Sequence, residues 1–117
     1  MSLDSDTFFR ALADETRRRC LLLLVQHGEL CVCELTYALG LPQPKISHHL
    51  GALRKAGMVS DNKQGLWVYY RLNPALPAWS QEVLQATMQG LATTAPYSDD
   101  HAALSEMPNR PGACCSA

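Results

Sequence analysis

The chain has 117 residues, of which 47% are hydrophobic, and its formal net charge is −1, values that predict one soluble domain with a modest core. Its longest apolar run, residues 21–25, is far shorter than the roughly 18 residues that span a bilayer, and its start lacks the basic segment of a secretory signal. We therefore expect a cytoplasmic protein with no membrane partner.

Two helices are predicted at the start of the chain. Asp4 or Ser5 can cap the first of them, and Asp14 can cap a second that runs from residue 15 to about residue 27. Gly28 supplies the left-handed residue that closes many helices. The leucine-rich second helix is expected to lie in the core.

A short helix over residues 32–39 is predicted next, with Gly40 as its stop. Glu34 lies where its side chain can accept a hydrogen bond from the free amides near Cys31. Cys31 and Cys33 meet the start of this helix, where the helix dipole favours thiolates, and a close pair of thiolates suits a soft metal or metalloid. The alternative is that both cysteines are small buried hydrophobes.

The sequence has five cysteines in all, an odd number in a chain without a secretory signal. This argues against a disulfide framework, so we expect reduced thiols that serve as core, metal ligand or redox group. The five are Cys20, Cys31, Cys33, Cys114 and Cys115.

A helix-turn-helix is predicted over residues 32–56. Leu41-Pro42-Gln43-Pro44 breaks the chain, and a further helix runs to Ala56 before Gly57. Its core side carries Ile46, Leu50, Leu53 and His49, which we expect to be a satisfied buried imidazole. The opposite side is small and polar near its start, which suits approach to DNA.

After Met58 the pattern becomes alternating and predicts a β-hairpin with its tip at Gln64-Gly65. A hairpin that directly follows a helix-turn-helix predicts a winged helix, so the expected fold class is mainly α with a β-hairpin wing (α+β). We expect one face to carry Leu66, Val68, Tyr70 and Leu72, and the other to carry Trp67, Tyr69 and Arg71.

Positive charge is concentrated in this middle part. Residues 41–71 hold five basic residues against one acid, a balance of +4. Residues 1–40 hold four against six, and residues 72–117 hold one against four. The positive part predicts a nucleic-acid surface, although solvated helices can carry similar charges. The predicted DNA-binding residues are Gln43, Lys45, Ser47, His48, Lys55, Lys63 and Arg71.

A final helix, opened by Pro74 and Pro77, carries few charges and a strongly apolar face. That face can pack on the chain's own first helix or on a second copy, and we expect a homodimer through the terminal helices. The predicted interface residues are Phe8, Leu12, Leu76, Trp79, Val83, Leu84, Thr87 and Leu91.

The last part of the chain, residues 93–117, is rich in small residues, prolines and acids, and it predicts a disordered tail. Residues 1–92 then form one DNA-binding and dimerisation domain. His27 and His101 show no metal-ligand spacing, and the final helix contains no histidine. These histidines therefore predict no zinc site, and the run Asp99-Asp100-His101 is only weak evidence for one.

Four segments within residues 8–74 together resemble the arsenic-responsive repressors of the ArsR/SmtB family of winged-helix metal sensors: ALADETRRRCLLLL, ELCVCEL, QPKISHHLGALRKAGMV and KQGLWVYYRLNP. The resemblance implies a dimer that binds its operator when unliganded and releases it when As(III) or Sb(III) binds cysteine thiolates. It places Cys31 and Cys33 in that site, with no organic cofactor and no enzymatic activity.

One departure from the family pattern leaves the third ligand open. Members similar to this chain often have a cysteine three residues after the second one, where this chain has Thr36. The candidates are Cys20, for which core packing is the stronger expectation, Cys114, Cys115, an external thiol, or no third protein ligand. A site of two thiols would suit methylarsenite, which has two open positions.

A helical-wheel argument predicts how binding acts. On an ideal helix Cys31 and Cys33 lie about 200° apart, so both cannot face one ion without distortion. We expect ligation to unwind the first turn of the helix over residues 32–39 and to tilt that helix, which supports the DNA-facing helix after it, so that the dimer loses its operator geometry. Alternatives are a zinc, cadmium or redox sensor using the same pair, or a thiol-dependent arsenate reductase, which would lack C-x-x-C spacing and a phosphate-cradling loop.

Overall fold

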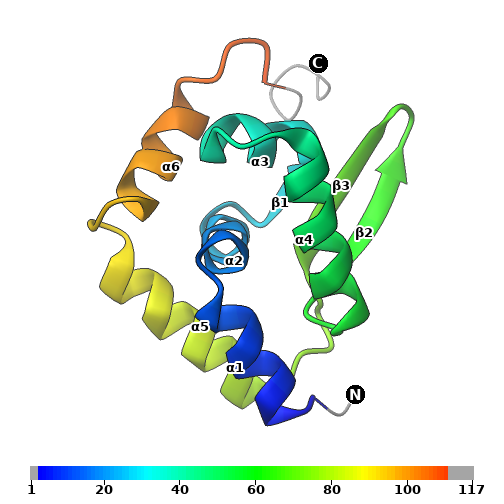
Figure 1. Cartoon of the computed structure of the whole chain (residues 1–117), viewed down its shortest axis with the longest axis vertical. Coiled ribbons are helices and arrows are strands. Elements are labelled where there is room, and N and C mark those ends of the chain that lie inside the picture. Colours follow the sequence, from blue (N-terminus) through cyan, green and yellow to red (C-terminus); the bar gives the residue numbers. More distant parts are fainter. Residues whose placement is uncertain (1–2, 111–117) are drawn as a thin grey trace.

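The computed structural model describes residues 3–110, which form six helices and a small three-stranded sheet that lies at one side of the molecule (Figure 1). The elements in chain order are α1 Ser5–Ala13, α2 Glu15–His27, β1 Glu29–Cys31, α3 Val32–Leu39, α4 Gln43–Lys55, β2 Val59–Gln64, β3 Trp67–Leu72, α5 Ala78–Leu91 and α6 Tyr97–Ser105. The helix-turn-helix and the wing are therefore present. No helix in the described range is both long and apolar enough to cross a membrane.

The predicted helix ends are confirmed at the first two helices. Asp4, rather than Ser5, caps α1 by accepting a hydrogen bond from the amide of Thr7 at 3.1 Å. Asp14 caps α2 through the amide of Arg17 at 3.0 Å, and this bond lowers the pKa of Asp14. Gly28 ends α2 with a φ of 83°, which an L side chain rarely adopts.

The sheet has the antiparallel order β1-β3-β2, so β3 is the central strand. β1 was not predicted, because three residues are too few for an alternating pattern to be recognised. It pairs Leu30 with Tyr70 and ends at Cys31. The first cysteine of the pair therefore lies in a strand that is hydrogen-bonded to the wing.

The hairpin differs from the prediction at its tip. Gln64 pairs with Trp67, so the turn lies at Gly65-Leu66, one residue later than predicted. Leu66 is 95% exposed and does not belong to a buried face. Tyr69 and Tyr70 are both buried, so the predicted strict alternation of faces is wrong at the centre of β3.

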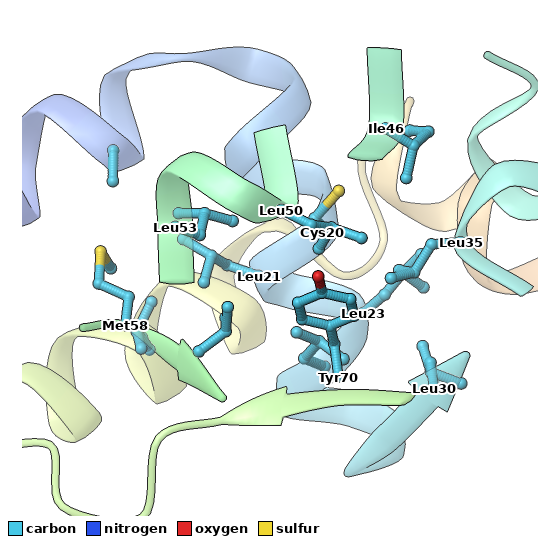
Figure 2. Packing of buried hydrophobic residues seen from close by; sticks show 14 of the residues in the cluster. Cys20, Leu21, Leu23, Leu30, Leu35, Ile46, Leu50, Leu53, Met58 and Tyr70 are labelled. Carbon is cyan, nitrogen blue, oxygen red and sulfur yellow. The ribbon is translucent and has the colours of Figure 1, made fainter. Parts of the chain in front are cut away.

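The core is built around α2, which Figure 1 shows nearly end-on with other helices around it. All four residues of the run 21–24 are buried because α2 packs against several elements at once. Figure 2 shows this packing, in which leucines of α2 meet side chains of α3, α4, the turn after α4 and the sheet: Leu30, Leu35, Ile46, Leu50, Leu53, Met58 and Tyr70.

The prediction that disorder begins at residue 93 is wrong for the part that forms α6. Tyr97, Asp100 and Leu104 are buried there. The carboxylate of Asp100 pairs with Arg19 of α2 at 2.6 Å, and Arg18 donates to the hydroxyl of Tyr97. The sequence did not indicate this helix, because its composition is polar and polar contacts with arginines of α2, a distant segment, hold it in place. Residues 111–117 lie outside the described part.

Candidate functional site

The two cysteines meet at the junction of β1 and α3. Cys31 is the cap residue before α3 and has extended backbone angles, φ −81° and ψ 162°, whereas Cys33 lies in the first turn. The structure joins their sulfur atoms in a disulfide, with 5.4 Å between the Cα atoms. Our expectation of reduced thiols therefore differs from the structure at this pair, although both sulfurs do converge.

The helical-wheel argument is wrong for the same reason. It assumed that both cysteines lie on one helix. Cys31 is instead the last residue of β1 and has an extended backbone, so the angular spacing of a helix does not apply to it. The two sulfurs meet with all residues of α3 still helical. Unwinding of the first turn is therefore not required for one atom to contact both sulfurs.

Glu34 holds this junction from inside the protein. Its side chain is 1% exposed, and its Oε1 accepts a hydrogen bond from the amide of Cys31 at 2.8 Å, as expected. Its Oε2 accepts from the guanidinium of Arg110, a contact that sequence reasoning missed. Because Arg110 follows α6, this ion pair places the segment after α6 beside the cysteine pair. Arg110 is 76 residues from Glu34 along the chain, so no local pattern in the sequence indicates that the two side chains pair.

Access to the sulfurs differs between the two positions. Cys31 is 1% exposed, whereas Cys33 is partly exposed. Thr36 is one turn further along α3, and its hydroxyl oxygen is buried with no hydrogen-bond partner among the described residues. A reagent from solvent therefore meets Cys33 first, next to a threonine whose hydroxyl is unsatisfied.

The candidate third ligands separate clearly. Cys20 is fully buried in the core, and desolvation raises the pKa of its thiol to about 12, so the thiol is protonated at neutral pH. This supports the packing interpretation. Cys114 and Cys115 lie outside the described residues. Within residues 3–110, no three His, Cys, Asp or Glu side chains form a group that could hold a metal ion.

The start of α4 presents the predicted polar surface. Gln43, Lys45, Ser47 and His48 are all exposed, whereas the intervening Ile46 is buried. No side chain caps the start of α4, which follows Pro42. Exposed polar side chains at an uncapped helix start suit phosphate and base-edge contacts.

His49 anchors the same helix from its inner side. Its Nδ1 accepts a hydrogen bond from Arg17 of α2 at 3.1 Å, so the imidazole is satisfied as expected, although it is only partly buried. Burial lowers the pKa of His49, and the positive charge of Arg17 lowers it further, against an opposing effect of Asp14. α4 is thus held to α2 by a neutral imidazole.

The remaining basic candidates divide into two groups. Lys55 is exposed at the end of α4, and Lys63 is exposed near the tip of the hairpin that lies beside α4 (Figure 1). Arg54 pairs with Asp61 at 3.1 Å, so the acid of this region already has a partner. Arg71 is not grouped with these residues: it lines a groove between the sheet, the end of α2 and the start of α5.

The predicted dimer face is only partly available. Phe8, Leu76 and Leu84 are buried in the chain's own core and leave almost no surface for a partner to bury, which favours the alternative that this face packs within the chain. Trp79 is 39% exposed and stacks edge-on against Phe8 at 5.0 Å. Partly exposed neighbours on the same two helices include Leu12, Val83, Thr87 and Leu91.

Phe9 extends this apolar surface and was not among the predicted interface residues. Its ring is 52% exposed and lies 6.3 Å from that of Trp79. Phe9 lies next to Phe8 in the predicted first helix, so the sequence could have indicated it as a further interface residue. They give α1 and α5 an exposed apolar patch.

Two histidines without ligand spacing also meet. His27, the last residue of α2, and His101 of α6 have ring nitrogens 3.1 Å apart. The pairing was not predicted, because α6 itself was not predicted.

Comparison with known proteins agrees with this architecture. A family model described as bacterial regulatory protein, arsR family, matches residues 14–61. The chain is 52% identical over 110 residues to the arsenic resistance transcriptional regulator ArsR2 of Pseudomonas putida, covering 92% of this chain and 94% of that one. It is 55% identical over 76 residues to the arsenical resistance operon repressor of Escherichia coli, 65% of each chain.

Solved structures show the same likeness. HlyU from Vibrio cholerae superposes with a TM-score of 0.67 at 28% identity, covering 75% of this chain and 91% of that one. The AntR antimony-specific transcriptional repressor superposes with a TM-score of 0.60 at 27% identity, covering 70% and 71%. With its helix-turn-helix, its wing and these relatives, the chain belongs to the arsR family of bacterial regulatory proteins.

Proposed function

We propose that this chain is a metalloid-responsive transcriptional repressor that binds operator DNA as a homodimer and releases it when As(III) or Sb(III) binds Cys31 and Cys33. The observation that carries this proposal is the convergence of the two sulfurs at the start of α3, the helix that packs on α4. The names of the relatives, which refer to arsenic and antimony, support the choice of metalloid. Members of this family are regulators and not enzymes, so no reductase activity is proposed.

The chemistry requires the dithiol form. A thiol reductant first converts the Cys31–Cys33 disulfide to two thiols, which lose their protons as they bind the metalloid. Soft thiolates suit a soft three-coordinate centre. The third position is filled by Cys114, Cys115 or an external thiol. Cys114 is four residues beyond Arg110, a reach of at most about 14 Å, and Arg110 is tied to Glu34 beside the pair.

Release of DNA follows from where the two sulfurs are attached. Cys31 belongs to β1, which is paired with β3, whereas Cys33 moves with α3. In the reduced protein the two sulfurs are not bonded to each other, so a metalloid atom bound to both fixes their separation and displaces one sulfur relative to the other. Because the sheet side is fixed by pairing, the displacement falls on α3 and on α4 behind it. A difference of a few kcal/mol between the two states suffices to empty the operator.

The experiment is an operator-binding titration by fluorescence anisotropy with reduced protein, in which arsenite, antimonite, zinc and an oxidant are added separately. The variant Cys31→Ser/Cys33→Ser is expected to bind DNA normally and to lose release by arsenite. Cys20→Ala is the matched control, because it removes a core thiol and is expected to retain release. Release of the double variant by arsenite would overturn the proposal.

The third ligand needs a separate comparison. In Cys114→Ser/Cys115→Ser, arsenite is expected to lose potency while methylarsenite, which needs two sulfurs, retains it. Equal retention of both inducers would assign the third position to an external thiol. Equal loss of potency for both inducers would show that Cys31 and Cys33 are insufficient even for an arsenical that needs only two sulfurs.

A redox sensor is the second candidate, because the structure holds the pair as a disulfide. In that case oxidation alone releases DNA and a reductant restores binding without any metalloid. The oxidant arm of the titration distinguishes the two functions.

A further inference from the structure

The pair His27 and His101 lies outside the cysteine site and joins two elements that are distant in sequence. The Nε2 atom of His27 is 3.1 Å from the Nδ1 atom of His101, and the two rings are nearly parallel with centroids 5.0 Å apart. His27 ends α2 and His101 lies within α6. We propose that these two imidazoles form a binding site for a divalent transition metal that bridges α2 and α6.

The separation of the two nitrogens fits a shared metal ion. A metal ion about 2.05 Å from each of two nitrogens that are 3.1 Å apart subtends an angle of about 100° between them. This lies between the octahedral and the tetrahedral angle. Imidazole nitrogen is a good ligand for Zn²⁺, Ni²⁺ and Cu²⁺. The separation therefore allows the two side chains to supply adjacent positions of one coordination sphere, in place of the hydrogen bond that now joins the two rings.

Both imidazoles are open to solvent. A neutral imidazole has the free lone pair that a metal requires. His27 is partly exposed and His101 exposed, so water can complete the coordination sphere.

The position of the site gives the metal a structural consequence. α6 leads to Arg110, which binds Glu34, and Glu34 holds the amide of Cys31. α6 also packs along α3 (Figure 1). A metal that pins α6 to α2 stabilises the arrangement that carries the cysteine junction. Because it uses no cysteine, the site stands or fails independently of the proposed response to metalloids.

The test is a titration of the full chain, with all five cysteines changed to serine or alanine, with Cu²⁺, Ni²⁺ and Zn²⁺ by isothermal calorimetry. We expect one ion per chain, with Cu²⁺ bound most tightly, as the Irving–Williams order requires. His27→Asn and His101→Asn should each weaken binding at least tenfold. His48→Asn removes an exposed imidazole from α4 and should leave metal binding unchanged.

Wild-type protein with its accessible thiols alkylated provides a second measurement that does not depend on the folding of the cysteine-free variant. The electron paramagnetic resonance spectrum of bound Cu²⁺ is expected to show coupling to two imidazole nitrogens and to lose one of them in His101→Asn. Equal binding by the wild type, His27→Asn and His101→Asn, or no binding by the wild type, would overturn the proposal.

Discussion

Replacement of Glu34 by alanine tests how the cysteine junction is held. Glu34 is 1% exposed and accepts hydrogen bonds from the amide of Cys31 and from Arg110. Hydrogen bonds to a charged group contribute about 1.5–3 kcal/mol each, and the loss leaves a buried amide unpaired. The guanidinium of Arg110 is 29% exposed, so water replaces part of that second contact. We expect Glu34→Ala to lower the free energy of unfolding by about 2–3 kcal/mol.

The assay is urea unfolding followed by circular dichroism at one fixed protein concentration, because the proposed dimerisation would make apparent stability depend on concentration. Glu34→Gln keeps an oxygen acceptor for the amide of Cys31 but removes the charge that faces Arg110. It should cost less, about 1 kcal/mol. If Glu34→Ala changes stability by less than about 0.5 kcal/mol, the ordinary range for surface substitutions, the inferred role of Glu34 is incorrect.

Three further outcomes follow from the same structure. Lys63→Ala should weaken binding to all DNA sequences alike and reduce the slope of log K against log salt concentration by about one. Ser47→Ala should instead change the sequence preference. Equal behaviour of the two variants in a binding assay with varied sites would contradict the assignment. Because the pKa of His49 is lowered in the folded chain, the unfolded chain binds more protons, so stability should fall as pH drops below about 6.5, and His49→Asn should flatten that dependence in thermal melts. Phe9→Ala should weaken dimerisation at least tenfold by sedimentation analysis, since its exposed ring would be buried by a partner; an unchanged dimer would place the interface elsewhere.

Local signals in the sequence were sufficient for most of the fold. Asp14 and Gly28 mark the ends of α2, and the bond from the Cys31 amide to Glu34 was expected from spacing alone. These features depend on residues three or four positions apart. The polar face of α4 was likewise predictable, because its period directly separates buried from exposed positions.

Long-range pairing explains what was missed. The helix α6 depends on Asp100 meeting Arg19, and the cysteine junction depends on Arg110 meeting Glu34, contacts that span 81 and 76 residues. The helical-wheel argument failed because pairing of β1 with β3 places Cys31 in a strand. The apolar face of α5 indicated burial correctly, but its pattern does not distinguish packing on α1 from packing on a second copy.

The most direct test of the central claim is to count the sulfur neighbours of bound arsenic by X-ray absorption at the arsenic edge, using reduced protein. The proposed function predicts three sulfur neighbours in the wild type in the presence of excess thiol. Cys31→Ser/Cys33→Ser should lose stoichiometric arsenic binding. An unchanged sulfur shell at full occupancy in that variant would contradict the assignment of Cys31 and Cys33 as the metalloid site.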